Sequence, residues 1–172
     1  LGLLHQSIWA RAETDKAQPS QAGHKVPITQ KESNKWLVAL SETVKWQPEG
    51  TRLVSVGDRE ADLFELFAHA QTLTTDLLLR AAQNRSVSTP EVGLLWPVVE
   101  KQPVAGHVKV QVSQRDEHPA REATVAVRYT ALVLRPPQHL RTQLKPLSLY
   151  AVLVQEIDPP AAVEPLDWLL LT

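Results

Sequence analysis

The feature of this sequence that most restricts its fold is a change of hydrophobic pattern near residue 90. Before it, short apolar runs alternate with segments of helical spacing, such as Trp36, Leu37, Leu40 and Val44. After it, aliphatic and β-branched residues alternate at period two between proline-rich turns. Strands alternating with helices favour a parallel or mixed sheet with helices on its faces. The second pattern is typical of antiparallel strands that have one solvent-exposed face.

The first half contains the start and stop signals that this interpretation needs. Thr29 and Glu32 have the spacing of a capping box and predict a helix start, and Pro48 with Gly50 predicts its end. Asp58 is expected to open a second helix. The strands expected in this half are residues 1–5, 53–56 and 76–80.

The second half predicts an antiparallel β subdomain and a returning strand. Its expected strands are residues 107–112, 123–134, 147–157 and 168–172. The resulting organisation is a first unit at 1–89, a β-strand insertion at 90–165 and a strand at 166–172 that returns to the first unit.

Composition excludes several classes of protein. The chain has 172 residues and a net charge of −1, and it contains no cysteine, which excludes a disulfide framework and thiolate metal sites. No apolar run approaches the roughly 20 residues of a membrane span. Methionine is also absent and both ends resemble strands, so we expect a fragment of a longer protein. Residues 80–145 carry ten basic and five acidic side chains, an excess that suits either a polyanion partner or a solvated surface.

One segment carries the pattern of a chemical site. In residues 57–62, Asp58, Glu60 and Asp62 follow directly on a buried strand. Ligands of open α/β sheets bind beyond the carboxyl ends of strands, where Asp58 would supply a hard oxygen to Mg²⁺ or Mn²⁺. The alternative is structural, because Asp is a preferred helix N-cap and acidic residues in a first turn complement the helix dipole.

This segment, Gly57-Asp58-Arg59-Glu60-Ala61-Asp62, resembles the "DREAD" motif of the DDE cut-and-paste transposases of bacterial insertion sequences, the family typified by the transposase of transposon five. The resemblance extends over essentially the whole chain. Further blocks match in the same order, at residues 2–6 with Trp9, 31–37, 119–121, 156–160 and 165–172.

The resemblance implies a partial ribonuclease-H-like core interrupted by an antiparallel β insertion. It implies metal-dependent cleavage and strand transfer at transposon ends, with three carboxylates holding two Mg²⁺ or Mn²⁺ ions. Asp58 matches the second carboxylate, and the other two would lie outside this chain. The fragment alone is therefore expected to be inactive, while its parent would be a transposase of the bacterial cytoplasm and nucleoid, without a membrane partner. The implied partners are double-stranded DNA at transposon ends and, in that complex, a second copy of the protein.

Four further residues are implied as DNA contacts. Trp168 matches a tryptophan that stacks on a flipped base, although a tryptophan among apolar neighbours is equally typical of a core anchor. Arg80 matches an arginine near the end phosphate, while Arg59 and Arg85 are candidate phosphate contacts by neighbourhood or ordinary surface charges. The sequence departs from the archetype at Ala82 and Asn84, where that protein has lysine and proline, which affects end-sequence specificity.

Two other functions remain open. The first is a non-catalytic β module that contributes DNA contacts or dimer packing, with Asp58 acting only as a helix cap. The second is a different ribonuclease-H-like nuclease.

Overall fold

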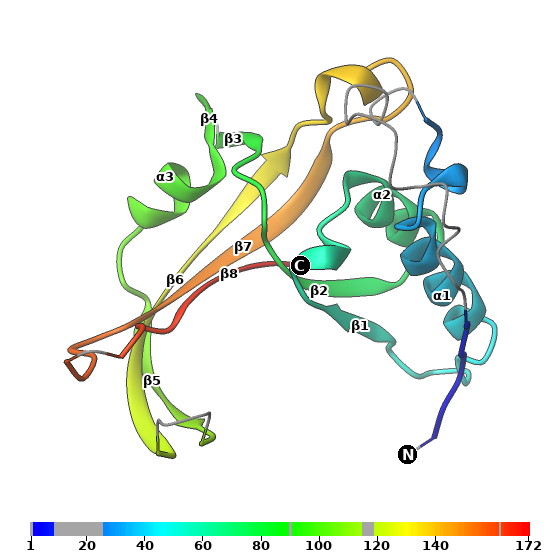
Figure 1. Cartoon of the computed structure of the whole chain (residues 1–172). Helices are drawn as coiled ribbons and strands as arrows, with labels where there is room; N and C mark the ends of the chain where they lie inside the picture. The colour runs from blue at the N-terminus through cyan, green and yellow to red at the C-terminus, as the bar shows by residue number, and fades with distance from the viewer. Residues whose placement is uncertain (1, 9–25, 90, 115–118, 162) are drawn as a thin grey trace, which may run out of the picture.

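The computed structural model describes residues 2–8, 26–89, 91–114, 119–161 and 163–172 (Figure 1). None of the helices in these ranges is both long and apolar enough to span a bilayer. The elements, in chain order, are the 3₁₀ helix η3 (Ile28–Gln30), α1 (Asn34–Val44), β1 (Val54–Gly57), the 3₁₀ helix η4 (Arg59–Ala61), α2 (Phe64–Thr72), β2 (Asp76–Arg80), β3 (Ser86–Thr89), β4 (Glu91–Leu94), α3 (Leu95–Glu100), β5 (Gly106–Val112), β6 (Arg121–Leu134), the 3₁₀ helix η5 (Gln138–Leu140), β7 (Leu147–Glu156) and β8 (Asp167–Leu171).

The described strands form one open, mostly antiparallel sheet of eight strands. Seven of them follow the order β1-β2-β8-β7-β6-β3-β4, and β5 pairs with the other end of β6. Only β1 and β2 pair in parallel. β8 runs antiparallel to both β2 and β7. It therefore joins the parallel pair of β1 and β2 to the long strands β7 and β6. The expectation of a mixed α/β protein is thus confirmed, and the antiparallel strands of the second half continue the same sheet.

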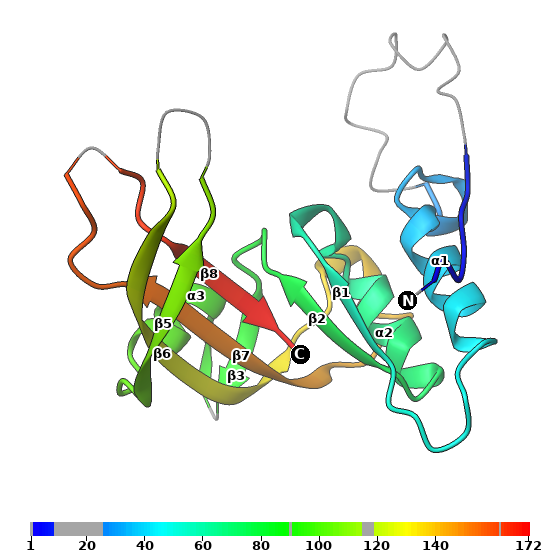
Figure 2. The same cartoon turned by 90° about the horizontal axis from the view of Figure 1, so that it is seen from below.

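The described helices pack against one face of this sheet, and the opposite face is exposed at Tyr129 and Tyr150. Alternate residues of the strands, among them Leu79, Leu153 and Leu171, are buried in a core shared with α2 and α3. Because side chains alternate across a strand, the residues between them point to the opposite face. In Figure 2 the strands lie in front of the helices, so this view looks onto that opposite face. We call it the open face.

The open face is defined by rows of side chains that run across neighbouring strands. One row consists of Tyr129, Val152, Leu170 and Arg80, which are successive partners on β6, β7, β8 and β2. The sheet arches in Figure 1, and the open face lies on the inner side of the arch. Side chains on this face therefore converge more closely than they would on a flat sheet.

Several expectations about local structure are wrong. Residues 2–8 form no strand. The helix expected from Thr29 begins only at Asn34, after a separate 3₁₀ turn, and Ser33 at its N-cap makes no side-chain capping bond. Asp58 caps η4 rather than α2, which begins at Phe64. The helical spacing of the apolar residues was sufficient to predict both helices, but local capping signals placed their starts too early.

Gly57 explains how η4 packs so closely under the end of β1. A Cβ atom at this position would lie 2.8 Å from both the Ala61 Cβ atom and a Leu79 methyl carbon. Only glycine therefore allows the backbone of β1 to approach the turn and β2 at this distance. The same geometry directs Gly57 toward the core and the following residue, Asp58, toward the open face.

Candidate nucleic-acid interface

The candidate site lies where the two parallel strands of the sheet end. Gly57 on β1 pairs with Leu79 on β2. The next residue along each chain segment, Asp58 after Gly57 and Arg80 after Leu79, lies at the same end of the sheet. The carboxyl ends of parallel strands are the usual position for ligand sites in α/β sheets. Asp58 is extended (φ −85°, ψ −166°) and exposed, and its Oδ1 atom accepts a hydrogen bond from the Glu60 backbone N–H at 3.0 Å. The capping role considered for Asp58 is therefore present in the structure.

Arg80 and Trp168 lie on the open face near this point. Arg80 is the direct partner of Leu170 on β8, and Trp168 is two residues away on the same face of β8. Leu169 and Leu171, which alternate with Trp168, belong to the core, whereas the half-buried Trp168 faces away from it. A diagonal pair of this kind on neighbouring strands is separated by roughly 7–8 Å. Arg80 and Trp168 can thus contact the same ligand.

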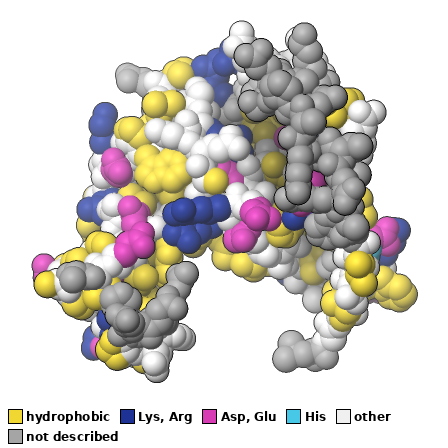
Figure 3. Space-filling view, in the orientation of Figure 1, with side chains coloured by type: hydrophobic (Ala, Val, Ile, Leu, Met, Phe, Trp, Pro, Cys, Tyr) yellow, Lys and Arg dark blue, Asp and Glu magenta, His cyan; other side chains and the backbone are white. Residues whose placement is uncertain are grey.

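A cleft of about 810 Å³ connects three of the residues expected to contact DNA. It runs along β8 toward the start of β6 and reaches η4 and α3. Asp58 and Arg85 are not part of its lining. Figure 3 shows basic, acidic and hydrophobic side chains side by side on the face seen in Figure 1. The charged and aromatic lining residues are Arg59, Arg80, Trp96, Arg121, Glu164, Asp167 and Trp168.

The charges in and beside the cleft balance once Arg121 is paired with Glu156. Arg121 is matched by Glu156, to which it donates two hydrogen bonds, one of them at 2.9 Å. Arg80 makes a long contact of 3.4 Å from Nη2 to the Asp167 carbonyl oxygen, so most of its donors remain available. Arg59 and Arg80 are therefore the cations best placed to meet a phosphate, and the carboxylates of Glu164 and Asp167 equal them in number.

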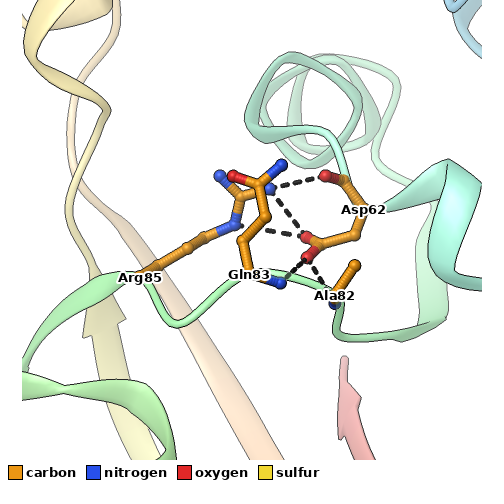
Figure 4. A network of polar contacts seen from close by, with 4 residues as sticks. All are labelled: Asp62, Ala82, Gln83 and Arg85. Carbon is orange, nitrogen blue, oxygen red and sulfur yellow. Dashed lines mark hydrogen bonds and ion pairs between the residues drawn. The ribbon is translucent and has the colours of Figure 1, made fainter.

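Asp62 holds together the loops that border the cleft (Figure 4). Its side chain is completely buried, and Oδ2 accepts backbone hydrogen bonds from Ala82 at 2.7 Å and Gln83 at 3.0 Å. Oδ1 accepts from the guanidinium of Arg85 at 2.8 and 3.2 Å, and the Asp62 carbonyl accepts from Arg85 Nη2 as well. The third carboxylate of the motif therefore fixes the loop that follows β2 against the turn that follows β1.

The same loop carries the start of α3. The Asn84 side chain accepts a hydrogen bond from the Trp96 backbone N–H at 3.1 Å, and the Arg85 carbonyl accepts one from the Leu95 N–H at 2.9 Å. Through these bonds Asp62 is linked to three pieces of the cleft wall, namely η4, the segment after Arg80 and the first turn of α3. Trp96 lines the cleft because of this docking, and no sequence motif marks it as a site residue.

The expectation of a phosphate contact by Arg85 is not supported by its position. Only 6% of the Arg85 side chain is exposed, and its guanidinium is held by Asp62. A phosphate would have to compete with a buried carboxylate for the same donors. Glu60, the remaining acid of the motif, is exposed and pairs with Lys35 at 3.4 Å. The three acids of the motif thus have three different environments.

The described residues do not by themselves form a two-ion site. Nowhere in the described ranges do three His, Asp or Glu side chains gather in a way that would hold a metal. Asp58 offers one carboxylate, of which Oδ1 is already a hydrogen-bond acceptor. A Mg²⁺ site needs several oxygen ligands in octahedral geometry, so further groups would be required. We derive no cleavage step from these residues alone.

Glu156 makes a specific contribution to the pH dependence of stability. The hydrogen bond from Arg121 lowers its pKa below the ordinary value, and the Leu166 backbone N–H, donating at 2.9 Å, lowers it further. A depressed carboxyl pKa stabilises the fold above the unfolded-state pKa, about 4.3, and this stabilisation is lost as the pH falls through the folded-state pKa.

We expect Glu156→Gln to reduce stability at pH 7 and to flatten the loss of stability below about pH 4.3. Urea unfolding at a series of pH values measures both effects. Glu164→Gln, a change in the segment between β7 and β8 for which the structure records no ion pair with a described residue, is the control. An unchanged acid slope in Glu156→Gln would show that other carboxylates control acid unfolding.

A comparison with protein-family models finds none that matches this chain.

Proposed function

We propose that this chain is part of a DDE-type DNA transposase and that the cleft beside β8 is its DNA-contact surface. The observation that carries the proposal is the gathering of Arg59, Arg80 and Trp168 along one cleft, although Trp168 is more than 80 residues from either arginine. All three are residues for which the sequence resemblance implies a DNA contact. Two guanidinium groups and an indole are the chemistry expected for phosphate contact and base stacking.

In this proposal Asp58 contributes one carboxylate to a site that other residues complete. Its position supports this role, because it leaves the sheet beside Arg80, at the end of two parallel strands. With those residues in place, two divalent ions would supply the activated nucleophile and stabilise the leaving oxygen. The setting would be the bacterial nucleoid, with a second copy of the protein in the DNA complex.

The second candidate is a DNA-binding β module without catalytic function. The capping bond of Asp58 to the Glu60 N–H favours it, because this bond explains the aspartate without a metal. The two candidates differ in their response to divalent ions. Mn²⁺ titration of the longer protein that contains this chain, with Asp58 and with Asp58→Asn, separates them. Loss of Mn²⁺ affinity in the variant supports the transposase, and equal affinity supports the module.

Arg80→Ala tests the DNA-contact surface that both candidates share. Removing one phosphate contact should weaken binding to duplex DNA and reduce the slope of log K against log salt by about one. Fluorescence anisotropy over a salt series measures both quantities. The matched control is Arg52→Ala, because Arg52 is a highly exposed arginine at the opposite end of β1, paired with Asp76. If both variants retain the wild-type slope, Arg80 does not contact phosphate.

A further inference from the structure

The open face carries two tyrosines that no role described above uses. They are both of the tyrosines in the chain, Tyr129 on β6 and Tyr150 on β7. They are 57% and 55% exposed, although they lie on the two longest strands of the sheet. Tyr129 is paired with Val152 and Tyr150 with Ala131, so the two rings are diagonal neighbours on the same face. Neither side chain contributes to the buried core.

These tyrosines continue the candidate DNA-contact surface. Tyr129 belongs to the row that passes through Val152 and Leu170 to Arg80. With strands about 4.8 Å apart, the row places Tyr129 roughly 14 Å from Arg80. Trp168 lies beside this row on β8. The open face thus presents three aromatic side chains and a guanidinium, joined by an apolar floor of valine and leucine.

We propose that the open face binds an unpaired DNA strand, with Tyr129 and Tyr150 stacking on successive bases beyond Trp168. Exposed aromatic side chains on a sheet surface are the usual platform for single-stranded nucleic acid. Diagonal neighbours are separated by roughly 7–8 Å, more than twice the 3.4 Å rise between stacked bases of B-DNA. This spacing fits a strand whose bases are spread apart and does not fit bases within a duplex.

The inference rests on the proposed DNA-binding function and adds the class of substrate that this face takes. It also predicts a characteristic salt dependence. The row from Tyr129 reaches its first charge at Arg80, and Arg52, which lines the same cavity as Tyr150, is already paired with Asp76. Stacking contributes affinity without releasing counterions. Loss of a tyrosine should therefore lower affinity at every salt concentration and leave the salt slope unchanged.

The test is fluorescence anisotropy with a fluorescein-labelled oligothymidylate, over a salt series, on folded variants of the full chain. We expect Tyr129→Ala and Tyr150→Ala each to weaken binding about five-fold or more, with an unchanged slope. Tyr129→Phe and Tyr150→Phe should bind like the wild type, because they retain the ring. Trp46→Ala removes a 67% exposed aromatic side chain outside the open face and is the control.

The other outcomes overturn the inference in distinguishable ways. If the tyrosine variants bind normally while Arg80→Ala weakens binding, the platform is wrong and the proposed function stands. If Arg80→Ala, Trp168→Ala and the tyrosine variants all bind like the wild type, both fail. If the tyrosine variants change only self-association, measured by light scattering, the open face is a protein interface. Weak binding by the phenylalanine variants would exclude stacking as its cause.

Discussion

Asp62→Ala should lower the free energy of unfolding by about 3–5 kcal/mol, because it removes one partner of a buried ion pair. Arg85 would keep its charge in a site where only 6% of its side chain is exposed. The backbone N–H groups of Ala82 and Gln83 would lose their acceptor. For a chain of this size, the corresponding fall in Tm is roughly 6–20 °C. Urea and thermal unfolding followed by circular dichroism measure it.

Glu60→Ala is the matched control, since it removes an exposed acid from η4, the short helix that Asp62 directly follows. Its effect should stay within about 0.5 kcal/mol. The double variant Asp62→Leu with Arg85→Met should be more stable than Asp62→Ala, because no unpaired charge remains buried. It should not reach wild-type stability, since the two N–H groups still lack an acceptor. Equal stability of Asp62→Ala and Glu60→Ala would contradict the network in Figure 4.

Trp168→Ala should weaken binding to DNA that carries an unpaired base by about 1–3 kcal/mol, which is roughly 5- to 150-fold. The indole lies outside the core, so its loss should affect binding more than folding. A duplex with a fluorescent base analogue at its end reports stacking directly through the emission of that base. Trp168→Phe should retain part of the affinity, because a smaller ring still offers a stacking face.

Two controls give this experiment a clear result. Trp46→Ala removes a tryptophan that is 67% exposed and follows the end of α1, outside the cleft. Unfolding of Trp168→Ala shows whether the fold is intact. Wild-type emission of the base analogue with Trp168→Ala would exclude stacking by Trp168. A large loss of stability in this variant would instead indicate the core role that its apolar neighbours suggest.

The strands were more predictable from the sequence than the helix starts. The expected strands at 76–80, 107–112 and 147–157 lie within one residue of β2, β5 and β7. Their patterns are set by burial of one sheet face, which repeats every second residue. The hairpin of β3 and β4 was missed because each strand has only four residues. The short helix α3 was missed because Pro97 argues against a helix, although proline is tolerated in a first turn.

The candidate site was predictable in its residues and less so in their roles. The position of Asp58 after a buried strand, and of Arg80 after the next, placed both at one edge of the sheet. The sequence does not distinguish Asp62 from Glu60, because both are acids near a helix start. Their difference arises from Arg85, 23 residues later, and from two backbone N–H groups that only the folded chain brings to Asp62. Long-range polar networks of this kind have no periodic signature.

β8 has a mechanical consequence for the whole molecule. It is hydrogen-bonded to β2 along one side and to β7 along the other. Within the described residues, the two halves of the sheet are therefore connected by paired strands. The paired strands β5 and β6 are therefore rigidly coupled to the rest of the sheet. Force applied to β6 passes through the hydrogen-bonded strands β7 and β8 to β2, whose last residue, Arg80, lies beside the turn after β1. A partner that binds β5 and β6 consequently transmits force to the edge of the sheet where Asp58 and Arg80 lie.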